Sequence, residues 1–339
     1  MINKHRGKRS FILEHKPVIT CWASVAGKKE SEGPLKSSFD IINTDTYFGQ
    51  KTWEQAEKHM QQLALETLLR KANISKGDLD LVLSGDLLNQ CIGSSFTLRN
   101  TGIAHLGLYG ACSTMAESLL IASMILDGGF CDRVVAMTSS HFAASERQYR
   151  FPLGYGGQRT PTAQWTVTGS GAALVCSSGT GPRITSCTIG AVRDLGIKDA
   201  NNMGAAMAPA AFDTIYTHFQ DLGVCAEDYD LIVTGDLGQV GKDTLLALAR
   251  DAGMSIGGKL ADCGTMIFDA LHQDVHSGGS GCGCSSIVLC GYLLEKLRTQ
   301  KVKRILFCGT GALLSPTSTQ QGLPIPGVCH AIAIEGESI

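Results

Sequence analysis

The chain has 339 residues, of which 44% are hydrophobic and 18% charged, so it holds enough apolar side chains for a large core. Its formal net charge of −2 gives no reason to expect a nucleic-acid-binding protein, because a phosphate-binding surface needs an excess or a cluster of basic residues. The 13 cysteines are scattered and odd in number, which favours free thiols in a reducing compartment.

The amino-terminal tail is basic, and only three apolar residues, 11–13, follow it before Glu14. Such a run is too short for the core of a signal peptide. The longest apolar runs elsewhere span about ten residues, roughly half of what a bilayer requires. We therefore expect no signal peptide, no transmembrane segment and at most a peripheral association with a membrane.

The first predicted elements are a helix over residues 53–70 and a short strand that begins after Asp80. The strand is a continuous run of Leu and Val that ends in Gly-Asp, a pattern typical of a strand buried on both faces.

The main candidate for a catalytic or ligand-binding residue lies in the segment 110–126. The run after Thr114 is apolar almost throughout, which predicts a centrally buried helix with a capping box formed by Thr114 and Glu117. Cys112 then lies at the amino end of the helix, where the helix dipole and free N–H groups lower the pKa of a thiol and bind anions. Cys112 is therefore a nucleophile, an anion-binding group or simply a small buried side chain.

A strand predicted over residues 133–137 leads into a segment, 138–160, that is rich in arginine and aromatic side chains. An arginine can hold a carboxylate through two hydrogen bonds, and aromatic side chains can pack against a flat ring. Solvated arginines are the alternative. The candidates in this segment are Arg147, Arg150 and Arg159 for carboxylates, and His141, Tyr149, Phe151 and Tyr155 for a ring.

The same order of elements then returns in the second half of the chain. A helix over residues 210–221 precedes Asp230 and a buried strand over residues 231–234, which again ends in Gly-Asp. A cysteine-containing apolar helix over 278–297 and a strand over 304–308 follow. Such a repeat of helices and buried strands predicts two mostly parallel sheets covered by helices and related by a pseudo-twofold axis.

These duplicated halves, with a cysteine in GACST at the head of a buried helix, resemble the thiolase fold of thiolases and 3-oxoacyl synthases. The resemblance implies an α/β fold, an internally duplicated α-β-α-β-α layered sandwich with halves at residues 1–180 and 181–339. It also implies that Cys112 is the acylated nucleophile. The family adds a base histidine after the repeated strand and a second histidine or asparagine motif in a glycine-rich loop.

The sequence departs from that family at the base. Asp236 stands after the second strand, where the histidine is expected, and the glycine-rich loop 276–281 keeps His276 and Gly279 but lacks the proline. An acyltransferase that uses Cys112 with His276 or His141 as base therefore stays an alternative to a protein without catalysis.

About a dozen uncommon strings, in order from Gly33 to Pro316, resemble the stage V sporulation protein AD family of spore-forming bacteria. Among them are GPLKSSFD, GACSTMAES, SERQYRFP and GGSGCGCS. The resemblance implies a protein that binds dipicolinic acid and helps to move it into the developing spore beside membrane proteins of its own operon. We expect a homodimer without a cofactor, peripheral on the forespore or spore inner membrane.

Dipicolinate is a flat pyridine ring between two carboxylates, so its site needs cationic or N–H donors at both ends. The hypothesis is that dipicolinate binds in the cleft around Cys112, either as the free acid or as its calcium complex. A structural scaffold for membrane partners is the third alternative. The candidate ligand-binding residues are Cys112, Ser113, Thr114, Glu117, His141, Arg147, Arg159, Asp236 and Gly279.

Overall fold

The computed structural model describes residues 3–149 and 158–337. Within these residues, two sets of five strands follow the same spatial order. In each set the first three strands are parallel, and the fourth is antiparallel to both of its neighbours, so four of the five share one direction. The two sets are β6 (His105–Gly107), β5 (Leu81–Gly85), β7 (Arg133–Ser140), β9 (Gly169–Cys176) and β3 (Val18–Ala26), and β12 (Leu260–Asp262), β11 (Leu231–Thr234), β14 (Arg304–Ala312), β15 (Gly327–Glu335) and β10 (Arg183–Thr188).

The two sets meet where β10 pairs with β3, through Arg183 and Val18. The two sheets expected from the sequence are thus joined by hydrogen bonds into one 13-stranded sheet of the described residues. An amino-terminal hairpin, β1 (His5–Arg6) and β2 (Ser10–Ile12), adds to β10, and β4 (Ile41–Ile42) adds to β3. The division of the chain into halves at residue 180 stays a prediction.

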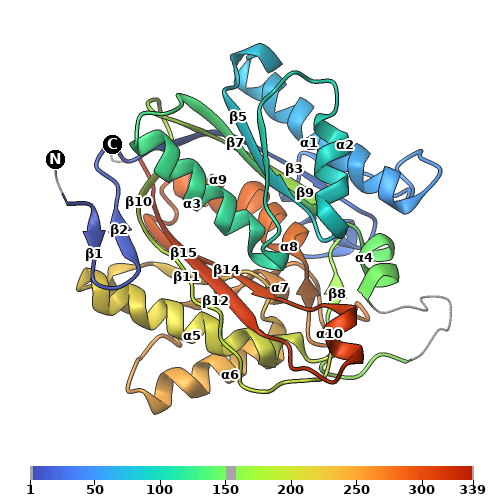
Figure 1. The fold of residues 1–339 in the computed structure, drawn as a ribbon, viewed down its shortest axis with the longest axis vertical. Coiled ribbons are helices and arrows are strands. Elements are labelled where there is room, and N and C mark those ends of the chain that lie inside the picture. The colour runs from blue at the N-terminus through green and yellow to red at the C-terminus, as the bar shows by residue number, and fades with distance from the viewer. Residues whose placement is uncertain (1–2, 150–157, 338–339) are drawn as a thin grey trace.

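Helices form three layers around the two sets of strands (Figure 1). Helix α3 (Thr114–Asp127) and α8 (Cys282–Val288) lie between the sets, and α8 continues through a π-helical turn, Leu289–Leu293, into α9 (Leu294–Arg298). Helices α1 (Trp53–Ala72) and α2 (Ile92–Leu98) cover one outer face, and α5 (Met203–Leu222) and α6 (Gly238–Asp251) cover the other. The apolar core follows these layers, with one buried cluster between the sets and one under each outer layer. The layered α/β sandwich predicted from the repeat is confirmed.

The repeated aspartates have the same structural role in both halves. Asp80 Oδ2 accepts hydrogen bonds of 2.8 Å from the backbone N–H groups of Asp132 and Arg133, at the start of β7. Asp230 Oδ2 accepts bonds of 2.6 and 3.0 Å from the two N–H groups at the start of β14. Each aspartate therefore fixes the amino end of the next parallel strand, which explains the repeat in physical terms.

The predicted helices exist, with changes at their ends. The helix expected over 53–70 is α1, capped by Thr52, whose Oγ1 accepts a 3.3 Å bond from the N–H of Gln55. The helix expected over 210–221 is α5, which begins seven residues earlier and contains Pro209. A proline usually ends a helix, so the start predicted from the sequence is too late. The segment 138–160 contains a helix, α4 (Phe142–Tyr149).

The capping box predicted at α3 is wrong. A 3₁₀ turn, Ala111–Ser113, precedes the helix, and the Thr114 hydroxyl donates to the Ala111 carbonyl at 2.7 Å instead of capping. The remaining elements are the 3₁₀ turns Glu30–Glu32, Lys36–Ser38, Lys76–Asp78, Asn89–Cys91 and Ala226–Asp228, the helices α7 (Cys263–Met266) and α10 (Pro316–Gln320), and the strands β8 (Trp165–Thr166) and β13 (Gly279–Ser280).

Candidate functional site

Cys112 lies in the 3₁₀ turn before α3, between the two sets of strands, with 5% of its surface exposed. The preceding residue, Ala111, has a φ of 52°, a left-handed conformation that costs a residue with a Cβ roughly 1–2 kcal/mol. Strained backbone of this kind concentrates at functional sites. The turn thus places the thiol at the carboxyl ends of the strands, where ligands bind in α/β sheets.

The electrostatic expectation for Cys112 is wrong. Burial raises the pKa of the thiol well above its usual value, and the neighbouring Asp236 carboxyl raises it further, both by its charge and by accepting the hydrogen bond of the thiol. The helix dipole predicted to lower this pKa does not offset a buried carboxylate. The thiol is therefore held in its protonated form.

Asp236 is fully buried and has partners for both carboxyl oxygens. The Thr310 hydroxyl donates to Oδ1 at 2.8 Å, and the Gly281 N–H and the Ser280 hydroxyl donate to Oδ2 at 2.9 and 3.3 Å. Burial raises the pKa of Asp236 to about 6, although these hydrogen bonds and that of the Cys112 thiol lower it. The acid that replaces the expected histidine is thus an integral part of the site.

The equivalent acid of the first half, Asp86, has a different role. It also follows a buried strand and a glycine, and it is also fully buried. Its carboxyl oxygens accept hydrogen bonds from the Leu88 N–H at 3.0 Å and from the N–H and hydroxyl of Ser94 at 2.8 and 2.7 Å. Asp86 therefore fixes the loop after β5, whereas Asp236 holds the thiol.

The end of β14 packs directly against the turn that carries Cys112. A Cβ on Gly309 would lie 2.4 Å from the Cβ of Ala116, and one on Gly311 would lie 2.8 Å from the carbonyl oxygen of Gly110. Only glycine permits this approach. The second half thus forms one wall of the space above Cys112.

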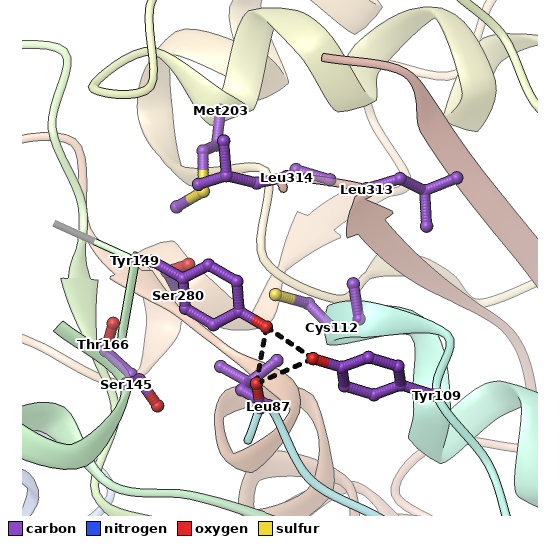
Figure 2. A pocket seen from close by; sticks show the side chains of 12 residues that line it. Leu87, Tyr109, Cys112, Ser145, Tyr149, Thr166, Met203, Ser280, Leu313 and Leu314 are labelled. Atoms are coloured by element: carbon purple, nitrogen blue, oxygen red, sulfur yellow. Dashed lines mark hydrogen bonds between the residues drawn. The ribbon is translucent and has the colours of Figure 1, made fainter. Parts of the chain in front are cut away.

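A pocket of about 210 Å³ opens beside Cys112. Figure 2 shows the sulfur pointing toward Tyr149, with Met203, Leu313 and Leu314 on the opposite wall. None of the described residues that line it carries a charge. Its lining residues are Leu87, Tyr109, Ala111, Cys112, Ser145, Tyr149, Thr166, Met203, Ser280, Ala312, Leu313 and Leu314.

Two tyrosines converge at this pocket on one backbone carbonyl. The hydroxyl of Tyr149 donates to the Leu87 carbonyl oxygen at 2.5 Å, and that of Tyr109 lies 3.0 Å from the Tyr149 hydroxyl and 3.4 Å from the same carbonyl (Figure 2). The side-chain amide of Gln148 also donates to it, at 2.9 Å. The Leu87 carbonyl oxygen is thus the common acceptor for the polar side chains of this wall.

Arg147 and Arg159, two of the arginines predicted to bind a carboxylate, do not line the pocket. Arg147 forms an ion pair with Glu54 and lies over the ring of Trp53. Arg159 pairs with Asp274 at 3.2 Å and lies over the ring of Trp165. Three further candidates of the segment, Arg150, Phe151 and Tyr155, lie outside the described residues.

The two candidate histidines also lie away from Cys112. His141 is buried, and its Nε2 donates to the Thr46 carbonyl at 2.8 Å; burial lowers its pKa. His276 has a φ of 51° and places its Nε2 3.2 Å from Asp274 Oδ1. Neither of them lines the pocket.

The other candidates surround the turn without lining the pocket. Ser113 is buried, and its hydroxyl donates to the Gly110 carbonyl at 2.7 Å. Glu117 lies beneath Gly110, burial raises its pKa, and its Oε2 has no hydrogen-bond partner among the described residues. Gly279 pairs with Trp165 and accepts a 2.7 Å bond from the side-chain amide of Gln164.

Sequence reasoning missed most of the apolar wall. Tyr109 stands three residues before Cys112, and Leu313 and Leu314 follow the glycines of β14 inside the string TGALLSP, so their positions beside recognised motifs were the available clue. Leu87 likewise follows the Gly-Asp that ends the repeated strand, whereas Met203 has no such clue, because an apolar side chain at a helix start is equally typical of a core.

Two halves of the same strand order around a central pair of helices, with a cysteine turn at the head of one, define a thiolase-like protein. Solved structures support this class at the level of the fold. OleA of Xanthomonas campestris is 18% identical with a TM-score of 0.62, over 96% of this chain and 97% of its own. The 3-oxoacyl-[acyl-carrier-protein] synthase III of Aquifex aeolicus is 16% identical with a TM-score of 0.55, over 94% and 99%.

Within this class, the chain belongs to the stage V sporulation protein AD family. The model of that family matches residues 7–335. The stage V sporulation protein AD of Bacillus subtilis (strain 168) is 45% identical over 332 residues, which are 98% of each chain. The resemblance seen in the sequence is thereby confirmed.

Proposed function

We propose that this chain binds dipicolinic acid in the pocket beside Cys112 and supports its uptake into the developing spore, without catalysis. The observation that carries the proposal is the pairing of Cys112 with Asp236. The pocket lies beside the cysteine turn, as expected of a thiolase-like site, but the Asp236 carboxyl, which keeps the thiol protonated, stands where the base histidine is expected. A pocket of this kind favours binding over acyl transfer.

The size and lining of the pocket support a small, flat ligand. Drug-sized ligands occupy pockets of about 300–1,000 Å³, so a cavity of about 210 Å³ suits a single ring with short substituents. Leu87, Met203 and Leu314 offer apolar contacts for a ring. The hydroxyls of Tyr109, Tyr149 and Ser145 offer hydrogen bonds for carboxylates at its edge.

The charge of Asp236, which lies next to the pocket-lining Cys112, affects which form of the ligand binds. A dianion brought close to the Asp236 carboxylate is repelled, unless Asp236 is protonated or the ligand carries a compensating cation. The neutral calcium complex of dipicolinate meets this condition at any pH, and the free dianion meets it when Asp236 takes up a proton. We therefore expect the complex to bind more tightly than the free dianion at neutral pH.

Calorimetric titration of the full chain with dipicolinate, with and without one equivalent of calcium, tests the proposal. Isophthalate, which has the same two carboxylates but no ring nitrogen, is the matched control ligand. Saturable binding of dipicolinate that weakens with isophthalate supports a receptor. A titration without heat up to millimolar dipicolinate, in both conditions, would contradict the proposal and favour a scaffold for membrane partners.

The second candidate function is acyl transfer with Cys112 as nucleophile. The strained φ of Ala111 favours it, because such strain concentrates at functional sites and the turn places the buried Cys112 at the wall of the pocket. Mass spectrometry after incubation with acyl-coenzyme A separates the two functions. A stable acyl group on Cys112, absent from a Cys112→Ala variant, would establish the enzyme and refute a purely binding role.

We also propose that the chain forms a homodimer through β6. Among residues 3–149 and 158–337, this strand pairs with β5 alone, so its outer edge presents backbone groups for another chain. Exposed apolar side chains surround it, with Leu106 at 50% and Phe96 at 45% exposure. Light scattering on the full chain and on Leu106→Asp checks the proposal, since a dimer through this edge should dissociate in the variant.

Uptake needs membrane proteins, and we propose that products of the same operon supply them at the forespore or spore inner membrane. In the described part of the chain, no helix is both long and apolar enough to cross a membrane. The proposal therefore predicts that the chain co-sediments with membranes that contain those proteins and not with bare vesicles.

A further inference from the structure

We propose that Tyr109 and Tyr149 are the specificity-determining residues of the pocket, and that their hydroxyls bind one carboxylate of the ligand. The inference rests on the proposed function and names the donors that hold a carboxylate in a pocket whose described lining residues carry no charge. It assigns to two phenols the binding of a carboxylate that was predicted for arginines.

The two hydroxyls form a single polar point on an apolar wall. They lie 3.0 Å apart, on side chains that come from different elements, Tyr109 before the cysteine turn and Tyr149 at the end of α4. Figure 2 shows both hydroxyls directed at the same place beside Leu87, below the thiol of Cys112. Two O–H donors at this separation match the two oxygens of one carboxylate.

The Leu87 carbonyl oxygen, which accepts hydrogen bonds from both phenols, has more donors around it than it needs. The Leu87 carbonyl oxygen is approached by three of them, Tyr109, Tyr149 and the amide of Gln148, and a carbonyl oxygen has two lone pairs. If a ligand takes the phenols, Gln148 still satisfies Leu87. The transfer therefore leaves no buried polar group without a partner, and its free-energy cost is small.

Tyr149 also stands in the path to the thiol. Its ring packs against the buried cluster of Leu87, Cys112 and Cys282. A ligand that contacts Cys112 in this pocket therefore also contacts this ring. It forms a hydrogen bond with the hydroxyl of Tyr149 when one of its carboxylates faces that hydroxyl.

The protonation state of Tyr149 suits this role. Burial raises the pKa of Tyr149 above its usual value, and the neighbouring Tyr109 hydroxyl raises it further. The hydroxyl of Tyr149 thus stays protonated across the physiological range. It can therefore donate to a carboxylate.

The test compares the full chain with Tyr109→Phe, Tyr149→Phe and the double variant, with Tyr47→Phe as matched control. Tyr47 is 41% exposed, stacks on Trp53 and does not line the pocket. The ligands are dipicolinate and its diamide, which keeps the ring but carries no charge. Hydrogen bonds to a charged group contribute about 1.5–3 kcal/mol, so we expect the preference for dipicolinate over the diamide to fall at least tenfold in the double variant.

A spectroscopic readout separates ligand contact from a structural role. A phenol that changes its hydrogen-bond partner changes its ultraviolet absorption, so dipicolinate should produce a tyrosine difference spectrum in the wild type and in Tyr47→Phe. The double Phe variant should lose it, with an unchanged melting temperature as the check on folding.

The outcomes distinguish the two proposals. Absence of dipicolinate binding by the wild type overturns the proposed function, and with it the role of the phenols. Binding by the wild type that keeps its ligand preference and difference spectrum in the double variant overturns the inference alone. If the double variant does not fold, the single variants and the difference spectrum of each decide the question.

Discussion

The carboxyl of Asp236 and the thiol of Cys112, which come from opposite halves of the chain, share a hydrogen bond in the interior. Burial raises the pKa of both groups, and each group shifts that of the other: the carboxyl raises that of the thiol, and the thiol lowers that of the carboxyl. The pair is therefore most stable with the thiol protonated, which ties the chemistry of Cys112 to the protonation of Asp236.

The affinity for free dipicolinate should depend on pH through Asp236. The pKa of this carboxyl is about 6 in the free protein, and a bound dianion raises it, so binding takes up a proton between pH 6 and the higher pKa of the complex. Affinity should therefore fall by up to tenfold per pH unit as the pH rises above about 6. Calorimetry from pH 6 to 8.5 measures this slope, and Asp236→Asn should flatten it; an equally steep slope in the variant would exclude Asp236 as the titrating group.

Cys112 should resist alkylation in the folded protein. Alkylating reagents attack the thiolate, and both burial and Asp236 oppose its formation. Cys225 is exposed and serves as the internal reference. Timed labelling with iodoacetamide at pH 7.5, followed by peptide mass spectrometry, should modify Cys225 first and Cys112 only after unfolding. Rapid labelling of Cys112 would show that the thiol is activated.

Removal of Arg147 should leave ligand binding almost unchanged. Its guanidinium pairs with Glu54 on the surface and lies over Trp53, away from the pocket. Exposed ion pairs contribute about 0–1 kcal/mol, so Arg147→Ala should change stability little. Titration of this variant with dipicolinate is the measurement. A tenfold loss of affinity would show that Arg147 binds a carboxylate of the ligand, as predicted from the sequence.

A methyl group on Gly309 should damage the site. The added Cβ would lie 2.4 Å from that of Ala116, so β14 and the cysteine turn would have to separate. Overpacking of this kind costs roughly 1–3 kcal/mol. Thermal melts should show a lower melting temperature for Gly309→Ala, whereas Gly258→Ala, whose new Cβ meets no atom within 4 Å, should melt like the wild type.

Glu30 should make stability depend on pH. It is fully buried, its Oε1 accepts a 3.0 Å bond from the Thr168 N–H, and its Oε2 has no partner among the described residues. Burial raises its pKa to about 7, above the value of the unfolded chain, so its contribution to stability is complete below about pH 4.5 and is lost as the pH rises through 7.

Glu30→Gln cannot ionise and should remove this loss. The variant should gain about 2.5 kcal/mol relative to the wild type between pH 5 and pH 8.5, since each pKa unit corresponds to about 1.4 kcal/mol and most of the shift falls in this range. Urea unfolding at both pH values gives the comparison. A stability difference that is the same at pH 5 and pH 8.5 would show that Glu30 does not titrate in the folded state.

The fold could be predicted from the sequence because its cues are local and repeated. Asp80 and Asp230 mark the same hydrogen bonds in both halves, and the buried strands after them are short continuous apolar runs. The early start of α5 was missed because Pro209 lies inside it. Residue type and spacing therefore suffice where one residue fixes one local contact.

The site could be predicted only in part, because its electrostatics depend on contacts across the two halves. Cys112 and Asp236 were both singled out, but the expected low pKa of the thiol was wrong, because that expectation rested on the helix end and left out burial and the Asp236 carboxyl. Likewise, Arg147 and Arg159 have the chemistry for a carboxylate, yet Glu54 and Asp274 pair with them.

The two aspartate contacts lie at the amino ends of their strands, whereas the pocket lies at the carboxyl ends. Substitutions near the pocket can therefore accumulate over evolution without loosening the strand pairing that Asp80 and Asp230 hold. This separation accounts for a fold that is shared at 16–18% identity between this chain and both OleA of Xanthomonas campestris and the 3-oxoacyl-[acyl-carrier-protein] synthase III of Aquifex aeolicus.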